Sequence, residues 1–220
     1  MMRSITAIAL AAGALTVASS AQAQCNTCEI YPTINNTQTA AHQIVQSNVT
    51  VDVGAVDGDA TVSGTAVGNN LSYKIDGIAG PINNTQSFGG VVISNVTLGS
   101  DSVGGNLKVD NTAVANNASL EFCCTAEVNN TQTAYNDPSA NTNVTVGTIS
   151  GDADISTTAV ANNLSITGQA MTINNTQNSS WAPVYANTNV TIANNVGGNL
   201  NVSGTAVGNN ISVKPTPATN

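Results

Sequence analysis

The chain has 220 residues, of which 41% are apolar, only 7% are charged and 3% are aromatic. Soluble domains average about 25% charged residues, so charged side chains are strongly depleted. In their place the sequence has 32 Asn and 28 Thr. Both residue types are poor helix formers that, together with Gly, favour strands, turns and backbone-bonding positions, so the composition excludes a helical protein.

The charge balance excludes several classes of partner. The chain has 12 acidic residues against four basic ones, for a net charge of -8. Nucleic-acid binding needs clustered Lys and Arg to neutralise phosphates, so we expect no nucleic-acid partner. The acidity also disfavours binding to anionic lipid, and no run of about 18 apolar residues follows the N-terminal segment. We therefore expect a soluble or surface-attached chain that does not span a membrane.

Residues 1–23 have the pattern of an export signal. Arg3 precedes an apolar stretch, and small residues follow up to Ala21-Gln22-Ala23. We expect cleavage before Gln24. The short, Ala-rich signal is of bacterial type, which predicts a mature protein in the periplasm or outside the cell, where disulfide bonds persist.

The four cysteines are an even number, which indicates disulfide bonds in an exported protein. Two of them lie in residues 24–33, which we interpret as an N-terminal cap or tether. The other two are adjacent in the sequence, and a bond between them would be strained, so each is expected to pair elsewhere, within the chain or with a second molecule. The spacing does not fit a zinc site of two C-x-x-C pairs, and we predict no metal. The disulfide candidates are Cys25, Cys28, Cys123 and Cys124.

Residues 34–213 contain an internal repeat with a period of about 47 residues. Asn-Asn-Thr-Gln begins at Asn35, Asn83, Asn129 and Asn174. Thr-Ala-Val begins at Thr65, Thr112, Thr158 and Thr205, and Asn-Val-Thr begins at Asn48, Asn95, Asn143 and Asn189. Three independent markers with one period predict four copies of a single structural unit.

Each unit contains four short pieces in which polar and apolar residues alternate, as in Asn48-Val49-Thr50-Val51, and Gly-, Asp- and Asn-rich turns separate them. Corresponding Asn-led pieces lie 20 to 26 residues apart, which predicts a coil of about 23 residues. We therefore predict an all-β fold, a repeat β-solenoid of four ~47-residue repeats with two coils each. The alternative is an antiparallel β-sandwich of short hairpins.

Stacked coils place like residues on like residues about 4.7 to 4.9 Å apart. Val49, Leu71, Val96 and Ala118 would then form one apolar ladder. The open strand edges at the two ends of such a stack are templates for another chain. Residues 214–220 contain Pro215 and Pro217, which we expect to block pairing at the C-terminal end. A single ladder of stacked asparagines is expected at Asn48, Asn70, Asn95, Asn117, Asn143, Asn163, Asn189 and Asn210.

Few side chains fit a catalytic role. His42 is the one histidine, and it lies in a link that the other repeats do not share. The close carboxylate pairs, Asp57/Asp59 and Asp152/Asp154, fall on turns where the other repeats have Gly105-Asn106 and Gly198-Asn199. We interpret these acids as turn residues and not as calcium ligands or hydrolytic residues, and we predict no enzyme activity and no cofactor.

Most aromatic residues lie in the links around Asn-Asn-Thr-Gln. Aromatic rings on loops can stack on sugars, so an edge that contacts glycan is one hypothesis. Covering the coil ends and filling a thin core is the other. The candidate glycan-contact residues are Tyr135, Trp181 and Tyr185.

The repeated Thr-Ala-Val-Gly/Ala-Asn-Asn, as at 65–70 and 112–117, followed by an alternating strand, resembles the curlin-type subunits of bacterial surface amyloid fibres. The rhythm is also similar to that of the holdfast-anchoring proteins of stalked alphaproteobacteria, which are exported through a curli-like outer-membrane pore. The resemblance covers nearly the whole mature chain, although Gln recurs in the repeats only at 38, 86, 132 and 177. It implies a structural or adhesive role, with copies of itself or other surface subunits as partners.

From these observations we predict an exported bacterial surface anchor or amyloid-like fibre subunit that acts in cell attachment or biofilm, outside the outer membrane, with polysaccharide as a further candidate partner. The alternative is a soluble extracellular solenoid that binds glycan or ice. Ice binding needs a regular Thr array on consecutive coils. The candidate Thr50, Thr97, Thr145 and Thr191 recur only on every second predicted coil.

Overall fold

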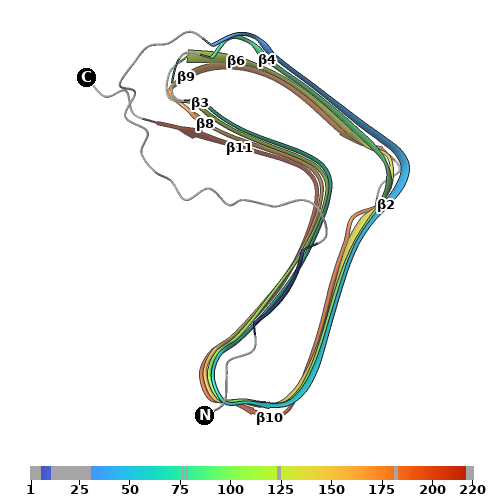
Figure 1. Cartoon of the computed structure of the whole chain (residues 1–220), viewed down its shortest axis with the longest axis vertical. Helices are drawn as coiled ribbons and strands as arrows, with labels where there is room; N and C mark the ends of the chain where they lie inside the picture. The colour runs from blue at the N-terminus through green and yellow to red at the C-terminus, as the bar shows by residue number, and fades with distance from the viewer. Residues whose placement is uncertain are drawn as a thin grey trace.

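The computed structural model describes residues 6–10, 31–75, 77, 79–122, 125–180 and 183–216. All regular structure in these residues is β-strand, arranged in two parallel sheets (Figure 1). The first sheet contains, in order, β1 (Thr6–Leu10), β3 (Ala60–Ile75), β5 (Leu107–Phe122), β8 (Ala153–Gly168) and β11 (Leu200–Pro215). The second contains β10 (Tyr185–Val196), β7 (Pro138–Ile149), β4 (Ile82–Val103), β6 (Thr125–Ala134) and β9 (Ala170–Ser179), with β2 (Ile34–Val56) also paired to β4.

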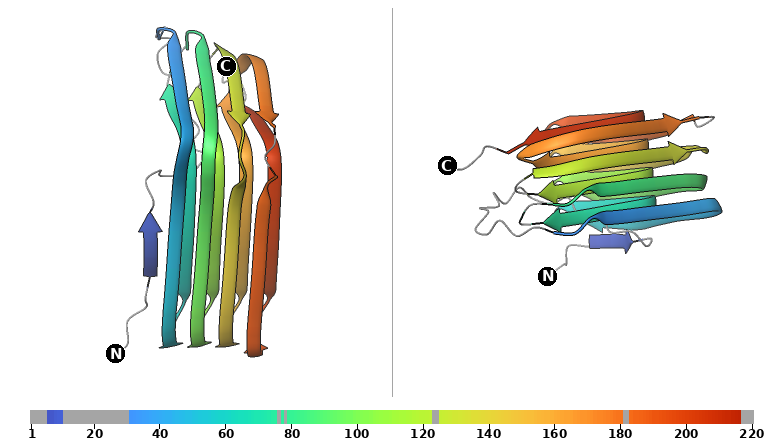
Figure 2. Two further views of the ribbon diagram at one scale, coloured as in Figure 1. Left: turned by 90° about the vertical axis from the view of Figure 1, so that its right-hand side faces the viewer. Right: turned by 90° about the horizontal axis from the view of Figure 1, so that it is seen from above.

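The predicted all-β fold is confirmed, and the antiparallel sandwich is wrong because the described strand pairs are parallel. The chain passes along one sheet, reverses in a tight turn, returns along the other sheet and then stacks on itself (Figure 2). This is the course of a flattened β-solenoid. Both sheets face a shared interior, so alternate residues of each strand point inward, as the buried Leu107 and Val109 flanking the exposed Lys108 show.

The prediction of two coils per repeat is wrong, because each repeat makes one coil. Asn48 pairs with Asn95 in the second sheet, and Asn70 pairs with Asn117 in the first. Asn48 and Asn70 therefore lie in opposite sheets of the same coil. The interval of about 23 residues measures the path from one sheet to the other and not the path between stacked levels.

The predicted coil is too short because several glycine-containing pieces that look like turns lie inside strands. Gly64-Thr65 and Gly68-Asn69-Asn70 lie inside the single strand β3. A Cβ at Gly68 would collide with the ring of Phe88. The same stacked position holds the small, buried Ala115 and Ala161 in the next two coils.

The molecule is a bent plate that is thin along the stacking direction (Figures 1 and 2). A strand of 22 residues such as β4 spans about 73 Å at 3.3 Å per residue, whereas four stacked levels occupy only about 19 Å. The two faces that end the stack are therefore large compared with the thickness of the molecule.

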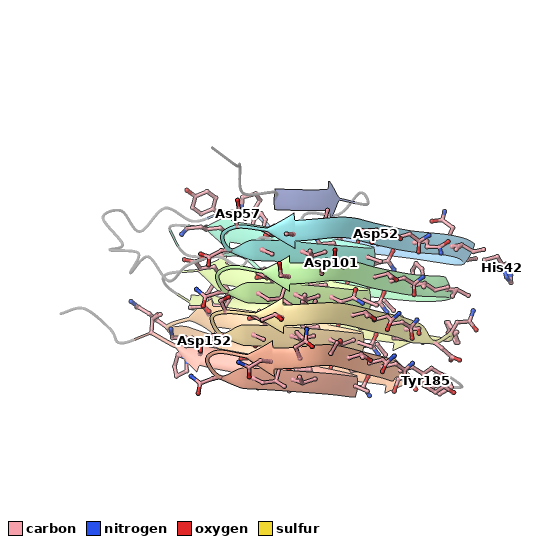
Figure 3. All side chains as sticks on the ribbon, turned by 90° about the horizontal axis from the view of Figure 1, so that it is seen from below. His42, Asp52, Asp57, Asp101, Asp152 and Tyr185 are labelled. Atoms are coloured by element: carbon pink, nitrogen blue, oxygen red, sulfur yellow. The ribbon has the colours of Figure 1, made fainter. Side chains whose placement is uncertain are left out.

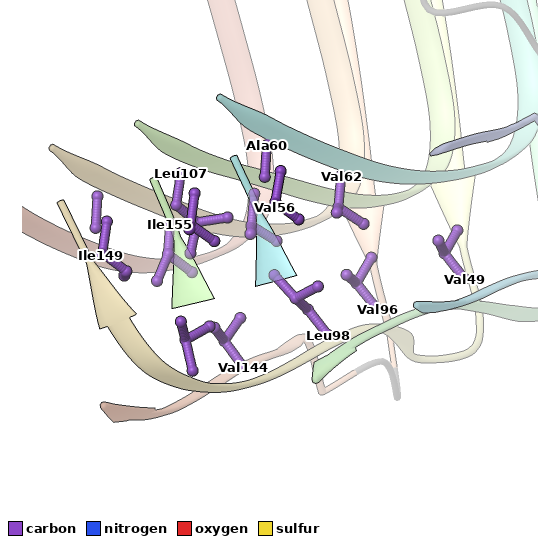
Figure 4. Close-up of a cluster of buried hydrophobic side chains, with 14 residues drawn as sticks. Val49, Val56, Ala60, Val62, Val96, Leu98, Leu107, Val144, Ile149 and Ile155 are labelled. Carbon is purple, nitrogen blue, oxygen red and sulfur yellow. The ribbon is translucent and has the colours of Figure 1, made fainter. Parts of the chain in front are cut away.

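Three clusters of buried apolar side chains lie along the length of each coil. The largest, next to the tight turns, contains Val49, Val62, Val96, Leu107 and Ile155 (Figure 4). The middle cluster is mostly alanine around Phe88, and the third surrounds Phe122 at the other end of the coil. Alanine therefore fills most of the middle of the plate.

The tight turns between the sheets stack through side-chain oxygen atoms. Oδ1 of Asp59 accepts a hydrogen bond from the backbone N–H of Asn106 at 2.7 Å, Oδ1 of Asn106 accepts one from Asp152 at 2.9 Å, and Oδ1 of Asp152 accepts one from Asn199 at 2.7 Å. Acid and amide alternate, so no two carboxylates lie on adjacent levels of this column. The turn role expected for Asp59 and Asp152 matches these hydrogen bonds.

Carboxylates on the strands are also kept off adjacent levels. Asp110 stacks between Ser63 and Ser156, and Asp154 stacks between Lys108 and Asn201. Glu121 lies beside Lys74, with 2.9 Å between its Oε1 and the lysine Nζ. Charged groups only about 4.8 Å apart repel when they are alike, and this register keeps these carboxylates off adjacent levels.

Several expected features cannot be placed. Cys25, Cys28, Cys123, Cys124 and Trp181 lie outside the described residues, as does most of residues 1–33. Of the expected export signal, Thr6–Leu10 forms β1, which pairs with Thr61–Thr65 of β3. Among the described residues, no helix is long and apolar enough to cross a membrane.

The expected block of pairing by the C-terminal prolines stays a prediction, because Pro217 lies outside the described residues. β11 continues through Lys214 to Pro215, which still pairs with Gly168. Proline removes a donor only at the last position of β11, so the preceding length of this edge retains its backbone donors and acceptors.

The stacked turns predict a sharp difference between two glycines. A Cβ at Gly151 would collide with Oδ1 of Asn106, whereas a Cβ at Gly58, in the first coil, has nothing within 4 Å. We expect Gly151→Ala to destabilise the protein by about 1–3 kcal/mol because the turn has no room for it. Thermal unfolding of both variants measures this, and Gly58→Ala should unfold like wild type. Equal melting temperatures for the two variants would contradict the turn stacking.

The alternating turn column predicts an effect of charge alone. Asn106→Asp keeps the acceptor for the N–H of Asp152 but places three carboxylates on adjacent levels. We expect a lower melting temperature at low salt that recovers in about 1 M NaCl, where repulsion is screened. Asp152→Asn, which removes a charge and keeps the acceptor, is the matched control and should not lower stability. A loss in Asn106→Asp that persists at high salt would show that charge is not its cause.

Candidate functional site

Three ladders of amide side chains run through the interior, perpendicular to the strands. We name each ladder by its first residue. The Asn36 ladder joins Asn36, Asn84, Asn130 and Asn175; the Gln38 ladder joins Gln38, Gln86, Gln132 and Gln177; and the Asn69 ladder joins Asn69, Asn116, Asn162 and Asn209. Their side chains occupy the space between the apolar clusters.

Gln132 shows how completely a buried rung is bonded. Its side chain has no solvent exposure. Nε2 donates to Oε1 of Gln86 at 2.8 Å and to the backbone oxygen of Asn163 at 2.9 Å, and Oε1 accepts from Nε2 of Gln177 at 2.7 Å. The bond to Asn163 crosses from the second sheet to the first. Gln132 of β6 therefore bonds to three other strands, β4, β8 and β9.

The Asn69 ladder joins the sheets in the same way from the opposite side. Nδ2 of Asn116 donates to Oδ1 of Asn162 at 2.8 Å and to the backbone oxygen of Thr133 at 2.9 Å. Oδ1 of Asn116 accepts from Nδ2 of Asn69 at 2.9 Å. Burial of an amide costs free energy unless its donors and acceptor are satisfied, and here the neighbouring coils satisfy them.

These interior ladders were not predicted as functional residues. The signal was present, because Asn-Asn-Thr-Gln and Gly/Ala-Asn-Asn recur in every repeat. The second Asn and the Gln of the first motif face inward, as does the first Asn of the second motif. From the sequence alone, Asn and Gln at fixed positions of a repeat indicate turns. Their inward position becomes visible only in the structure, where the two sheets face each other.

The predicted single asparagine ladder is wrong in its connectivity. Asn70, Asn117, Asn163 and Asn210 form one outer ladder in the first sheet, with 2.7 Å at each step. A separate outer ladder in the second sheet joins Asn48, Asn95, Asn141 and Asn187. Asn143 instead bonds Asn189, at 3.0 Å. A further outer ladder joins Asn35, Asn83, Asn129 and Asn174.

Asn143 is displaced because the register shifts by two residues between the second and third coils, where Asn95 pairs with Asn141. In the third repeat Thr158 comes 15 positions after Asn143, whereas in the second Thr112 comes 17 positions after Asn95. The shift also breaks the outer threonine row: Thr50 pairs with Thr97, but Thr97 pairs with Asn143. The row thus recurs on adjacent coils, contrary to expectation, but it is not continuous.

The outer bend of the second sheet, which we call the elbow, collects irregular and exposed residues. His42 lies there with φ of 57° in a bulge of β2, and it stands with Tyr185 on one side of the molecule (Figure 3). Tyr135 and Tyr185 are each 49% exposed, Ile44 is 71% exposed, and its partner Val91 is 36% exposed. Burial raises the pKa of Asp137, which follows Tyr135 in the break between β6 and β7. Asp57 and Asp152 lie on the opposite side, at the tight turns (Figure 3).

The last coil, made of β9, β10 and β11, presents its interior to solvent. Leu200, Val202, Ile211 and Val213 are 51%, 44%, 46% and 43% exposed. Their partners one coil earlier, Ala153, Ile155, Leu164 and Ile166, are at most 1% exposed. The difference comes only from the missing next level. The first coil is better covered, since Ala60 and Val62 are 6% and 3% exposed beneath β1.

A family comparison decides which kind of protein this is. The family model for holdfast attachment protein D matches residues 54–220, which is more than half of the chain and includes every strand from β3 onward. The chain belongs to the holdfast attachment protein D family. No curated protein and no solved structure matched the chain. The predicted resemblance to holdfast-anchoring proteins is thereby confirmed, while the likeness to curlins rests on repeat rhythm alone.

Membership in the holdfast attachment protein D family supports a role in surface attachment and an envelope-associated location. Within the matched region, the described structure concentrates its exposed apolar side chains at the elbow and on the last coil. These two surfaces are the candidate functional sites. Within the part of the chain that the structure describes, the last coil offers in addition unpaired strand edges and amide ladders that end without a next rung.

The interior ladders predict a large effect from an isosteric change. In Gln132→Glu the carboxylate keeps the acceptor but loses both donor bonds, to Gln86 and to Asn163. We expect destabilisation of about 3 kcal/mol or more near pH 7. Asn174→Asp, at an exposed rung, is the matched control and should cost little.

The pH dependence of the same variant gives a second readout. Burial raises the folded-state pKa of the new carboxyl above its unfolded value, so more protons are bound in the folded state and stability falls as pH rises. Gln132→Glu should therefore unfold at a higher temperature near pH 4 than near pH 7, relative to wild type. A variant as stable as wild type at neutral pH would contradict the buried ladder.

Proposed function

We propose that this chain is an exported structural protein of the bacterial surface that anchors the holdfast to the cell envelope without catalysing a reaction. Family membership supports the attachment role. The export pattern of residues 1–23 supports a location outside the outer membrane. The alternation of acid and amide in the turns gives the close carboxylates a structural use in place of a catalytic one.

The observation that carries this proposal is the open last coil. A strand edge with unpaired backbone groups, next to exposed apolar side chains, is a surface to which another β-strand adds. β9, β10 and β11 are 10, 12 and 16 residues long and have a partner on one side only among the described residues. Such a long parallel edge suits a permanent mechanical joint with another surface subunit, including curli-like growth of a fibre.

The elbow supports a second contact, with the polysaccharide that an anchor has to hold. Tyr135 and Tyr185 present half of their surface to solvent and belong to the third and fourth coils. Tyrosine combines an apolar ring with a polar hydroxyl, which suits contact with sugars. An anchor of this design would hold polysaccharide along its side and envelope subunits at its end.

Complementation of a holdfast-forming bacterium tests the anchor function. In a strain whose own family member is deleted, we expect cells to release their holdfast onto the surface, and expression of this chain to restore retention. A fluorescent lectin that labels the holdfast, counted on cells and on the surface, gives the fraction retained. If the complemented strain sheds holdfast as the deletion strain does, although the protein reaches the envelope, the proposed function is wrong.

The double variant Tyr135→Ser and Tyr185→Ser separates the two contacts. Both side chains are half exposed, so folding should be unaffected, and any loss of binding to purified holdfast polysaccharide would come from the elbow. Asn201→Ser, on the outer face of β11, is the control. Unchanged polysaccharide binding by the double variant would leave the elbow without this role.

A further inference from the structure

The two ends of the stack carry different hydrogen-bonding groups, because every amide ladder has a direction. In the Asn70 ladder, each Nδ2 donates to Oδ1 of the preceding coil. The ladders that begin at Asn35, Gln38 and Asn48 run the same way. The Asn36 and Asn69 ladders run the opposite way, with each Nδ2 donating to the following coil.

The last coil therefore ends in four side-chain oxygens and two amide groups that have no next rung among the described residues. The oxygens belong to Asn174, Gln177, Asn187 and Asn210, and the amide groups to Asn175 and Asn209. The first coil offers the reverse set: amide groups of Asn35, Gln38, Asn48 and Asn70, and oxygens of Asn36 and Asn69.

A first coil laid on a last coil in the same direction would bring a donor to an acceptor in all six ladders. Two last coils placed face to face would instead set their edge strands antiparallel, so the six ladders of the two copies would not meet in register. Unpaired or opposed polar groups lose free energy when they are buried. The amide groups thus favour a head-to-tail join over a two-fold one.

The apolar residues and the turn column fit the same join. Continuing the register of β3, β5, β8 and β11 by one level places Leu200, Val202, Ile211 and Val213 against Ala60, Val62, Leu71 and Tyr73 of another copy. In the turn column, Asn199 would lie beside Asp59, which preserves the alternation of amide and acid. Among the described residues, the join would bring one pair of like charges together, Lys214 of one copy and Lys74 of the other. Oε1 of Glu121 lies 2.9 Å from Nζ of Lys74 and would offset this repulsion.

We propose that copies of this chain stack head to tail, with the first coil (β2 and β3) of one copy on the last coil (β9, β10 and β11) of the next. The inference rests on the proposed anchor function and names a second copy of the chain as the partner of the last coil. The incoming β11 would take the place on β3 that β1 occupies over Thr61–Thr65, so the join needs residues 1–23 removed or displaced. The product is a polar filament that ends in a first-coil face at one end and a last-coil face at the other.

A pair of introduced cysteines tests the direction of stacking. Ser72 and Ser212 are exposed outward-facing residues of the first and last coils, at equivalent positions three levels apart, which is too far for a disulfide within one molecule. In a head-to-tail join they would be strand neighbours. The chain is expressed with its own leader, recovered after export, oxidised at increasing concentration and examined on non-reducing gels.

The double variant Ser72→Cys, Ser212→Cys should give a series of covalent dimers, trimers and longer species. Each single variant should give no more than wild type, which supplies the background from the four native cysteines. Covalent dimers from Ser212→Cys alone, above the wild-type background, would indicate a join between two last coils and would overturn the proposal. A double variant that stays at background at all concentrations would overturn it as well.

A matched pair of lysine substitutions tests the face itself. Val202 points along the interior of the last coil and is 44% exposed, so lysine is tolerated in the monomer but would be buried in the join. Asn201→Lys changes the adjacent, outward-facing position. By light scattering, Val202→Lys should raise the concentration needed for assembly by about tenfold or more, with Asn201→Lys close to wild type. Equal assembly of the two variants would overturn the assigned face.

The outcomes distinguish this inference from the proposed function. Holdfast retention that is restored by a chain that never self-associates, or that assembles only with a different envelope protein, would overturn head-to-tail stacking and leave the anchor role intact. Head-to-tail assembly in a chain that fails to restore retention would overturn the anchor role and leave head-to-tail stacking intact.

Discussion

The structure depends on one constraint, the stacking of identical amides at the spacing of adjacent coils. An amide side chain can donate and accept at once, so a column of Asn or Gln satisfies itself only when its neighbours on both sides are also amides. Buried rungs such as Gln132 and Asn116 meet this condition and also bond across to the opposite sheet. The columns therefore set the register of both sheets together. A displaced coil would break several interior hydrogen bonds at once.

This constraint accounts for the unusual composition. A plate only four levels thick buries little apolar volume, and the alanine-rich middle adds little more. Amide columns supply directional bonds where the interior is too narrow for large apolar residues. Charged residues are excluded from the columns because like charges would lie on adjacent levels. Acids on the described strands stack on Ser, Thr, Asn, Gly or Lys, as Asp110 and Asp154 do.

The repeat period, the strand character and the attachment family were accessible from the sequence, because three markers recur at one interval and the alternation of polar and apolar residues has period two. The number of coils was not accessible. Alternation shows that a residue faces inward or outward but not which sheet it belongs to, so Asn48 and Asn70 looked like stacked neighbours although they lie in opposite sheets. The inward role of Asn69 was hidden for the same reason. The two-residue register shift at Asn141 depends on repeat length and on the fixed turn, which no single motif records.

The direction of the ladders connects the fold to the function. Inside the plate every level has a partner on both sides. Among the described residues the last coil has a partner on one side only, and the first coil is covered only over Thr61–Thr65, so an anchor can use these faces to join other molecules. The most direct test of the account is which residues are neighbours along the stack. Ser119 pairs with Ser165, one repeat later, so oxidation of Ser119→Cys, Ser165→Cys should form a disulfide within one molecule, identified by mass spectrometry of the digested monomer. If instead the double variant Ser119→Cys, Thr145→Cys forms the disulfide within one molecule, the coils are about 23 residues long and the account is wrong.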